Sequence, residues 1–169
     1  MRRTWAAIGQ TPVLDADGGP RDKVSVIGGV SVSPRRRRLG FYFATEANGF
    51  YTADKVVGFL RDLLRHLRGN VIVVWDNGNN HKGPLVREYL RRNRRLRLEL
   101  LPPWAPDHNP VEAVWSWLKY GELANYVPQH IPELDDAVVD RLIELKFDPE
   151  LLRALWNRSK LPFPKTQNG

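Results

Sequence analysis

Two carboxylates in this sequence stand where the pattern of the chain changes. Asp76 follows the apolar run Val71–Trp75, and Glu112 comes shortly after the pair Asn109-Pro110. Thirty-five residues separate the two acids along the chain. Carboxylates are preferred ligands of hard divalent cations such as Mg²⁺. If the fold brings the two acids together, they are candidate ligands of a metal ion.

The position of Asp76 allows two interpretations. Val71–Trp75 is apolar at every position, which predicts a strand that is covered on both faces. In open α/β sheets, functional sites form beyond the carboxyl ends of the strands. The polar loop after Asp76 contains Asn77, His81 and Lys82, whose side chains can donate to phosphate oxygens. The alternative is that Asp76 only caps the turn that follows the strand.

Glu112 also allows two interpretations. Asn109 is the predicted N-cap of a helix and Pro110 its first residue, which places Glu112 at the third helical position. In a capping box, the glutamate at that position accepts a hydrogen bond from the N–H of the cap residue. This segment alone favours the capping role. The alternative is that Glu112, Ser116 and Lys119 form a polar stripe that faces an active cleft.

The aromatic residues near these acids are interpreted as secondary or structural. A hard cation prefers carboxylates and water to imidazole, so His81 is interpreted as a contact to phosphate or water. His108 is interpreted as a loop residue. Trp104 and Trp115 are interpreted as anchors of the core or of a loop rather than as platforms for base stacking.

The composition indicates a globular protein with a polyanionic partner. The chain has 169 residues, of which 42% are hydrophobic, enough for one compact domain. There is no Cys and no apolar run of about 18 residues, which predicts a cytoplasmic protein without a membrane span. The net charge is +7, from 26 basic and 19 acidic residues. Nucleic acid is the simplest partner for such an excess, and a solvated Arg-rich surface is the alternative.

Periodicity predicts alternating strands and helices, as in an α/β sheet. Residues 1–160 are expected to form one domain, and residues 161–169 a flexible tail. The predicted strands are one within 4–12, followed by a turn, and 23–32, 39–43, 71–75 and 96–101. The predicted helices are 53–68, 84–94, one that begins at 110, 132–146 and 149–159, with a loop over 121–131. Arg35–Arg38 is expected at a hairpin tip, either solvated or in contact with DNA.

Three stretches of the chain resemble mariner-type transposases. Residues 75–82 (WDNGNNHK) resemble the second-acid motif of that family. Residues 101–115 (LPPWAPDHNPVEAVW) resemble its third-acid motif, Leu-Pro-Pro-aromatic-Ser-Pro-Asp-Leu-Asn-Pro-Ile-Glu-x-x-Trp. Ala105, His108 and Val111 stand here for the Ser, Leu and Ile of the pattern. Residues 3–12 resemble the segment just after the family's first acid, and the chain is most similar to the bacterial insertion-sequence branch, the DDE superfamily endonucleases.

This resemblance implies a fold, a reaction and a ligand set. The fold would be α/β: a ribonuclease-H-like mixed sheet flanked by helices. The activity would be DNA cleavage and strand transfer in transposition, with two Asp and one Glu binding two Mg²⁺ or Mn²⁺ ions. One ion activates water or a DNA 3′-hydroxyl, and the other stabilises the leaving oxygen. On this transfer Asp76 is the second acid and Glu112 the third, both as metal ligands.

The resemblance also implies partners. Asn77, His81, Lys82 and Lys119 are the expected DNA contacts, and transposon ends and target DNA are the expected partners. The intact family protein is expected to be a homodimer that makes no contact with a membrane.

The sequence departs from the family at its first acid. In the family that acid lies on a central strand upstream of the segment that resembles Arg3-Thr4-Trp5, and this chain begins after that point. Asp15 and Asp17 lie in the wrong loop to replace it. The expectation is therefore a catalytic domain without its first, central strand and without the family's N-terminal helix-turn-helix region, inactive alone. A non-catalytic, basic DNA-binding remnant is the alternative, and an α/β interaction domain whose two acids are only caps is a third possibility.

Overall fold

The structure is a computed structural model, which describes residues 23–33, 35, 38–76, 78, 83–103 and 105–163. Its first described element is an antiparallel hairpin of β1 (Val24–Ser33) and β2 (Arg38–Ala47). The register runs from Val24 opposite Ala47 to Ser33 opposite Arg38. Both predicted strands are confirmed. β1 has the predicted length and is shifted by one residue, whereas β2 is longer than the sequence pattern indicated because the pairing continues to the ends of the hairpin.

The next four elements alternate between helix and strand, beginning with a helix. They are α1 (Ala53–His66), β3 (Val71–Trp75), α2 (Pro84–Arg92) and β4 (Leu96–Leu100). β3 and β4 are parallel, as a connection through a helix allows. Gly69 turns the chain between α1 and β3 with φ = 76°, a conformation that is costly for residues with a Cβ.

The last part of the chain is helical. A short 3₁₀ turn, η2 (Pro106–His108), leads into α3 (Pro110–Trp117), which continues as a π-helical turn, η3 (Leu118–Glu122). α4 (Ile131–Phe147) and α5 (Pro149–Trp156) follow. The predicted loop therefore starts only after Glu122. No helix in the described ranges is both long enough and apolar enough to cross a bilayer.

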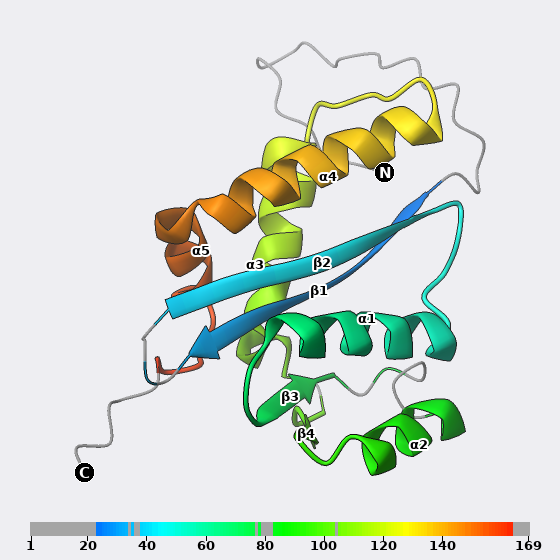
Figure 1. Ribbon diagram of the computed structural model, residues 1–169. Helices are drawn as coiled ribbons and strands as arrows, with labels where there is room; N and C mark the ends of the chain where they lie inside the picture. Colours follow the sequence, from blue (N-terminus) through cyan, green and yellow to red (C-terminus); the bar gives the residue numbers. More distant parts are fainter. Residues whose placement is uncertain are drawn as a thin grey trace.

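Two separate apolar cores hold these elements together. The larger core packs α3, α4 and α5 against the hairpin, as Figure 1 shows. The smaller core packs α1 and α2 against β3 and β4. The buried residues of the larger core are Phe41, Val111, Val114, Leu118, Leu123, Val138, Leu142, Leu145, Leu152 and Leu155. Those of the smaller core are Val56, Val57, Leu60, Leu64, Val86 and Leu96.

The two faces of the hairpin pack against different cores. Val24, Val26 and Val30 of β1 pack against the larger core, whereas Ile27 packs against the smaller one. Alternate residues of a strand point to opposite faces of its sheet. The helices α3 to α5 and the helix α1 therefore lie on opposite faces of β1.

The prediction that β3 is covered on both faces is wrong. The side chains of Ile72 and Val74 are 64% and 52% exposed, while Val71, Val73 and Trp75 pack against the smaller core. The uniformly apolar pattern cannot distinguish a strand that is already covered from one whose second face is bare.

The mixed sheet is interrupted between its two halves. Among the described residues β1 pairs only with β2, and β3 pairs only with β4, so the strands form two sheets of two strands each. β1 and β3 point in opposite directions in Figure 1, where α1 is drawn between them. The expectation of an α/β sheet flanked by helices is thus met by two half-sheets rather than by one continuous sheet.

Candidate active site

A large groove runs between the two half-sheets. Its volume is about 1420 Å³, and Val26–Ser33 of β1 and Val71–Asp76 line its long sides. α1 closes it with Val56 and Leu60, and α3 closes it with Val111 and Trp115. Asp76 and Glu112 both belong to the lining. The structure therefore brings the two predicted acids to one groove from two different halves of the molecule.

Asp76 lies at the carboxyl end of β3, and its side chain is exposed. One carboxylate oxygen, Oδ1, accepts a hydrogen bond from the backbone N–H of Gly78 at 2.9 Å. The interpretation of Asp76 as a cap of the following turn is therefore confirmed. A carboxylate has two oxygens with about four acceptor sites, which is more than a single hydrogen bond uses.

Glu112 occupies the first turn of α3, where its side chain is exposed. Asn109 caps the helix as predicted, because the N–H of Val111 donates to its Oδ1 at 3.3 Å. The capping-box interpretation of Glu112 is wrong, since the N–H of Asn109 donates instead to the carbonyl oxygen of Pro106 at 2.9 Å. The 3₁₀ turn thus satisfies the donor that the box would need. No described residue donates a hydrogen bond to the Glu112 carboxylate.

The helix that carries Glu112 is held by one apolar face. Val111 and Val114 are buried in the larger core. On the groove side, the indole of Trp115 lies against β1 so closely that a Cβ on Gly28 would be 2.7 Å from its Cη2 atom. The interpretation of Trp115 as a core anchor is confirmed, and α3 is fixed on β1 by this contact.

The turn before α3 is tied to the end of α5. The Nζ atom of Lys160 lies 2.6 Å from Oδ2 of Asp107, and the N–H of Lys160 donates to the carbonyl oxygen of Asp107 at 2.7 Å. The hydrogen bond from the Lys160 ammonium lowers the pKa of Asp107 below its usual value. Phe163, at the start of the expected flexible tail, packs edge-on against Trp156.

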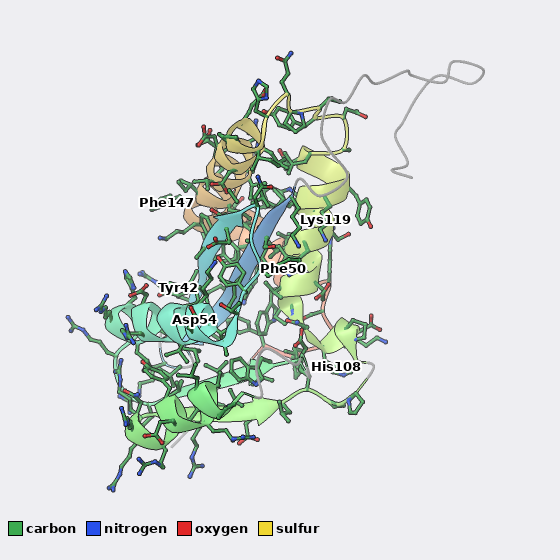
Figure 2. All side chains as sticks on the ribbon, turned by 90° about the vertical axis from the view of Figure 1, so that its right-hand side faces the viewer. Tyr42, Phe50, Asp54, His108, Lys119 and Phe147 are labelled. Atoms are coloured by element: carbon green, nitrogen blue, oxygen red, sulfur yellow. The ribbon has the colours of Figure 1, made fainter. Side chains whose placement is uncertain are left out.

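The other candidate residues lie in different places. His108 lines the groove, and its buried Nδ1 has no hydrogen-bond partner among the described residues. Lys119 is exposed on η3 and is absent from the described lining, and Figure 2 shows it at the other end of the α3–η3 helix from His108. Asn77, His81 and Lys82 lie outside the described residues, as do Trp104 and the N-terminal residues 1–22.

Three arginines in the lining of the groove add to these candidates. Arg35, Arg38 and Arg68 line the groove and are exposed. None of these three makes an ion pair with a described residue, in contrast to Arg91, which binds Glu88 at 2.8 Å. The run of arginines was visible in the sequence, but the place of Arg68 in the same lining depends on the fold.

The donors at the acid end of the groove suit a hard cation. Asp76 and Glu112 offer carboxylate oxygens, and Mg²⁺ is commonly held by one or two carboxylates together with water and substrate phosphate. Within the described ranges no group of three His, Cys, Asp or Glu side chains could hold a metal. The carboxylates of Asp76 and Glu112 are of the kind that one such ion takes, and a second ion would need further ligands.

Solved structures with a similar fold are transposase catalytic domains. The crystal structure of the catalytic domain of Mos1 mariner transposase is 15% identical, with a TM-score of 0.56, over 80% of this chain and 77% of that chain. The Mos1 strand transfer complex is 17% identical, with a TM-score of 0.60, over 93% of this chain and 46% of that chain. The Mos1 paired-end complex with left transposon end is 17% identical, with a TM-score of 0.61, over 96% and 47%. This chain spans about half of the length of the transposase in those two complexes.

These structural likenesses show the expected mixed α/β, ribonuclease-H-like fold. No curated protein sequence matches the chain. The sequence profile of one family, described as DDE superfamily endonuclease, matches residues 1–135, which is most of the chain. On that match, the chain belongs to the DDE superfamily of endonucleases.

Proposed function

We propose that this chain is the catalytic-domain portion of a mariner-type DNA transposase of the bacterial insertion-sequence branch. Its reaction is metal-dependent cleavage and strand transfer of DNA. The observation that carries this proposal is the shared groove of Asp76 and Glu112, because each acid stands in a segment that resembles an acid motif of the family. The absence of a capping-box bond to Glu112 supports a role for its carboxylate other than helix capping.

In this proposal the two acids are metal ligands rather than proton carriers. When bound, the divalent ions activate the attacking hydroxyl and stabilise the leaving oxygen. Asp76 holds its position through the bond from Gly78, and Glu112 through the packing of α3 on β1. Asn77, His81, Lys82 and Lys119 are proposed contacts to DNA. Mg²⁺ or Mn²⁺ is the proposed cofactor.

The proposal also covers the partners, the oligomeric state and the location of the intact protein. Its partners are the transposon ends and the target DNA, and it acts as a homodimer in the cytoplasm. The family comparison and the basic character of the chain support these partners, since a net charge of +7 favours polyanions. Residues 1–160 form the catalytic portion in this proposal.

A first test measures metal binding. Titration calorimetry with Mn²⁺ should show that Asp76→Asn and Glu112→Gln each weaken the affinity by about tenfold or more, because each removes one charged ligand. Glu99→Gln is the matched control, since Glu99 is exposed on β4 and is absent from the described lining of the groove. Equal Mn²⁺ affinity in the unchanged chain and in these three variants would contradict the proposed metal-dependent reaction.

The chain of 169 residues is proposed to be inactive by itself, because two carboxylates hold two ions poorly. Incubation with supercoiled plasmid and Mg²⁺ is expected to leave the plasmid intact. Nicking that disappears in Asp76→Ala would contradict the inactivity and would support the nuclease chemistry more strongly.

A non-catalytic, basic DNA-binding protein is the second candidate. The lining arginines Arg35, Arg38 and Arg68, which make no ion pair with a described residue, favour it, since they offer phosphate contacts other than Asp76 and Glu112. It predicts that the chain binds DNA of any sequence and that this binding is retained in Asp76→Ala and in Glu112→Ala. Arg38→Ala with Arg68→Ala should then lower the slope of log K against log salt by about 2, at about 0.9 for each phosphate contact. Arg91→Ala is the control, because that guanidinium is already paired with Glu88.

A further inference from the structure

His108 brings an imidazole ring to the groove that the packing of the chain does not use. Its side chain belongs to the same lining as Asp76 and Glu112, and it precedes Glu112 by only four residues. The Nδ1 atom of the ring is buried and has no hydrogen-bond partner among the described residues. A buried polar atom without a partner lowers stability, and such atoms are normally satisfied by protein, water or a ligand.

The backbone of His108 is fixed on both sides. Its N–H donates to the carbonyl oxygen of Ala105 at 3.1 Å within η2. The residue before it, Asp107, is tied to Lys160, and the residue after it, Asn109, caps α3. Figure 2 shows His108 at the beginning of α3. A ring on a fixed backbone can bind a ligand with little loss of conformational freedom.

The geometry does not favour a metal-binding role for this ring. His108, Asp76 and Glu112 all line the groove, but within the described ranges no three side chains of His, Cys, Asp or Glu could hold one ion. A hard cation also prefers carboxylate and water oxygens to imidazole. The ring is therefore available for a hydrogen bond, and a ligand in the groove has to supply the partner.

A phosphate group is the partner that fits the rest of the lining. A neutral imidazole donates through one ring nitrogen, and the oxygens of a phosphate diester accept hydrogen bonds. A hydrogen bond to a charged oxygen is shorter and stronger than one between neutral groups. Arg38 and Arg68 in the same lining also offer donors to a polyanion.

We propose that His108, with its proton on Nδ1, donates a hydrogen bond to a phosphate oxygen of DNA in the groove. The identity of this ligand rests on the proposed function. In this division of roles the two carboxylates hold the cation, and His108 holds a phosphate without contacting the ion. The family pattern has Leu where this chain has His108, so the contact is a feature of this chain rather than of the family.

The first test compares DNA binding by three variants of the whole chain. Fluorescence anisotropy with a short labelled duplex and Mn²⁺ should show that His108→Leu weakens binding by about tenfold, because a charge-assisted hydrogen bond is lost. His108→Asn should retain most of the affinity, since its amide can place a donor near the position of Nδ1. His130→Leu is the matched control, because His130 is exposed before α4 and is absent from the described lining of the groove.

The stability of His108→Leu separates this role from a structural one. The family pattern indicates that the fold accepts Leu at this place. The substitution removes a buried nitrogen without a partner, so Tm should rise by about 2 °C or more while the affinity for DNA falls. A residue that only supports the fold would lower Tm when it is replaced.

A second readout observes the ring itself. The chain has four histidines, and after ¹⁵N labelling of histidine the signals that are missing from His108→Leu assign the ring of His108. The duplex should shift the Nδ1 signal of His108 and leave the signals of His130 in place. An Nδ1 signal that does not respond to DNA would mean that water is its partner, which would contradict the proposed contact.

Three further results would overturn the contact. Unchanged DNA affinity in His108→Leu would exclude the hydrogen bond to phosphate. A lower Tm in that variant would mean that the ring nitrogen has a partner within the chain. A weaker affinity for Mn²⁺ without DNA would make His108 a metal ligand. Failure of the contact leaves the Mn²⁺ test of Asp76 and Glu112 intact, whereas a failed Mn²⁺ test would remove the proposed reaction and leave the binding data on His108 standing.

Discussion

The two halves of this molecule differ in how completely they cover their strands. The hairpin half packs three helices over one face, and Val114, Leu142 and Leu145 have no solvent exposure. The half that contains β3 and β4 has the smaller buried cluster, and Ile72 and Val74 remain largely exposed on β3. Hydrophobic stabilisation follows the apolar area removed from water, so the two halves are unequally stabilised.

This difference matters because the candidate site is divided between the halves. Glu112 belongs to the well-covered half through α3, and Asp76 ends a strand of the sparsely covered half. The two acids line one groove, but no strand among the described residues connects their supports. The geometry of the site therefore depends on what fixes one half against the other.

The largest predicted effect is a loss of stability that differs between substitutions in the two cores. Leu142→Ala should lower the free energy of unfolding by about 3–5 kcal/mol, because the dense cluster around it cannot collapse into the cavity. Leu60→Ala should cost about 2–3 kcal/mol, since Leu60 borders the groove and its surroundings can relax. Urea denaturation measures both values. If Leu60→Ala lowered the free energy of unfolding as much as Leu142→Ala or more, the two halves would not be unequally stabilised.

The next effect concerns the contact that holds α3 on β1. Gly28→Ala would place a Cβ 2.7 Å from Trp115, so we expect a loss of about 1–3 kcal/mol and a displaced helix. Gly29→Ala is the matched control, because a Cβ there has no neighbour within 4 Å. Thermal unfolding and the fluorescence of Trp115 are the measurements. A neutral Gly28→Ala with unchanged fluorescence would show that the contact does not position Glu112.

The smallest effect concerns the tie between Lys160 and Asp107. The pKa of Asp107 is lowered in the fold, so its ionised form stabilises the protein above the unfolded value of about 4, and this contribution is lost as the pH falls through the folded pKa. Lys160→Ala should lower Tm by less than about 2 °C at pH 6, and the difference should shrink as the pH falls below about 4. Lys146→Ala, which removes an ammonium that makes no ion pair with a described residue, is the control. A difference that does not shrink as the pH falls would contradict the assignment to Asp107.

Local pattern was sufficient to predict the elements of this fold. The i, i+4, i+8 spacing of Val56, Leu60 and Leu64 predicts α1, and these side chains are buried as that spacing requires. The pair Asn109-Pro110 predicts the start of α3 to the residue. Both signals lie in contiguous sequence, which is why they could be read without coordinates.

Long-range features were less predictable. The capping-box pattern at Glu112 was misleading, because the N–H of Asn109 donates to the carbonyl oxygen of Pro106 in the preceding turn. The residues Asn109 to Glu112 alone do not show this hydrogen bond. The apolar pattern of β3 indicated burial, but burial depends on a neighbour that other residues must supply. The joint position of Asp76 and Glu112 in one groove was expected only from the resemblance to a family. That Arg68 lines the same groove as the hairpin arginines was not expected at all.

The central claim is that Asp76 and Glu112 hold the same cation, and affinity cleavage by iron tests it directly. Fe²⁺ with ascorbate and peroxide generates radicals at the ion, which cut the backbone near its ligands. We predict two sets of cuts, one near residue 76 and one near residue 112, and the loss of both sets in Asp76→Asn as well as in Glu112→Gln. Cuts at only one of these positions, or a set that survives substitution of the other acid, would contradict a shared ion.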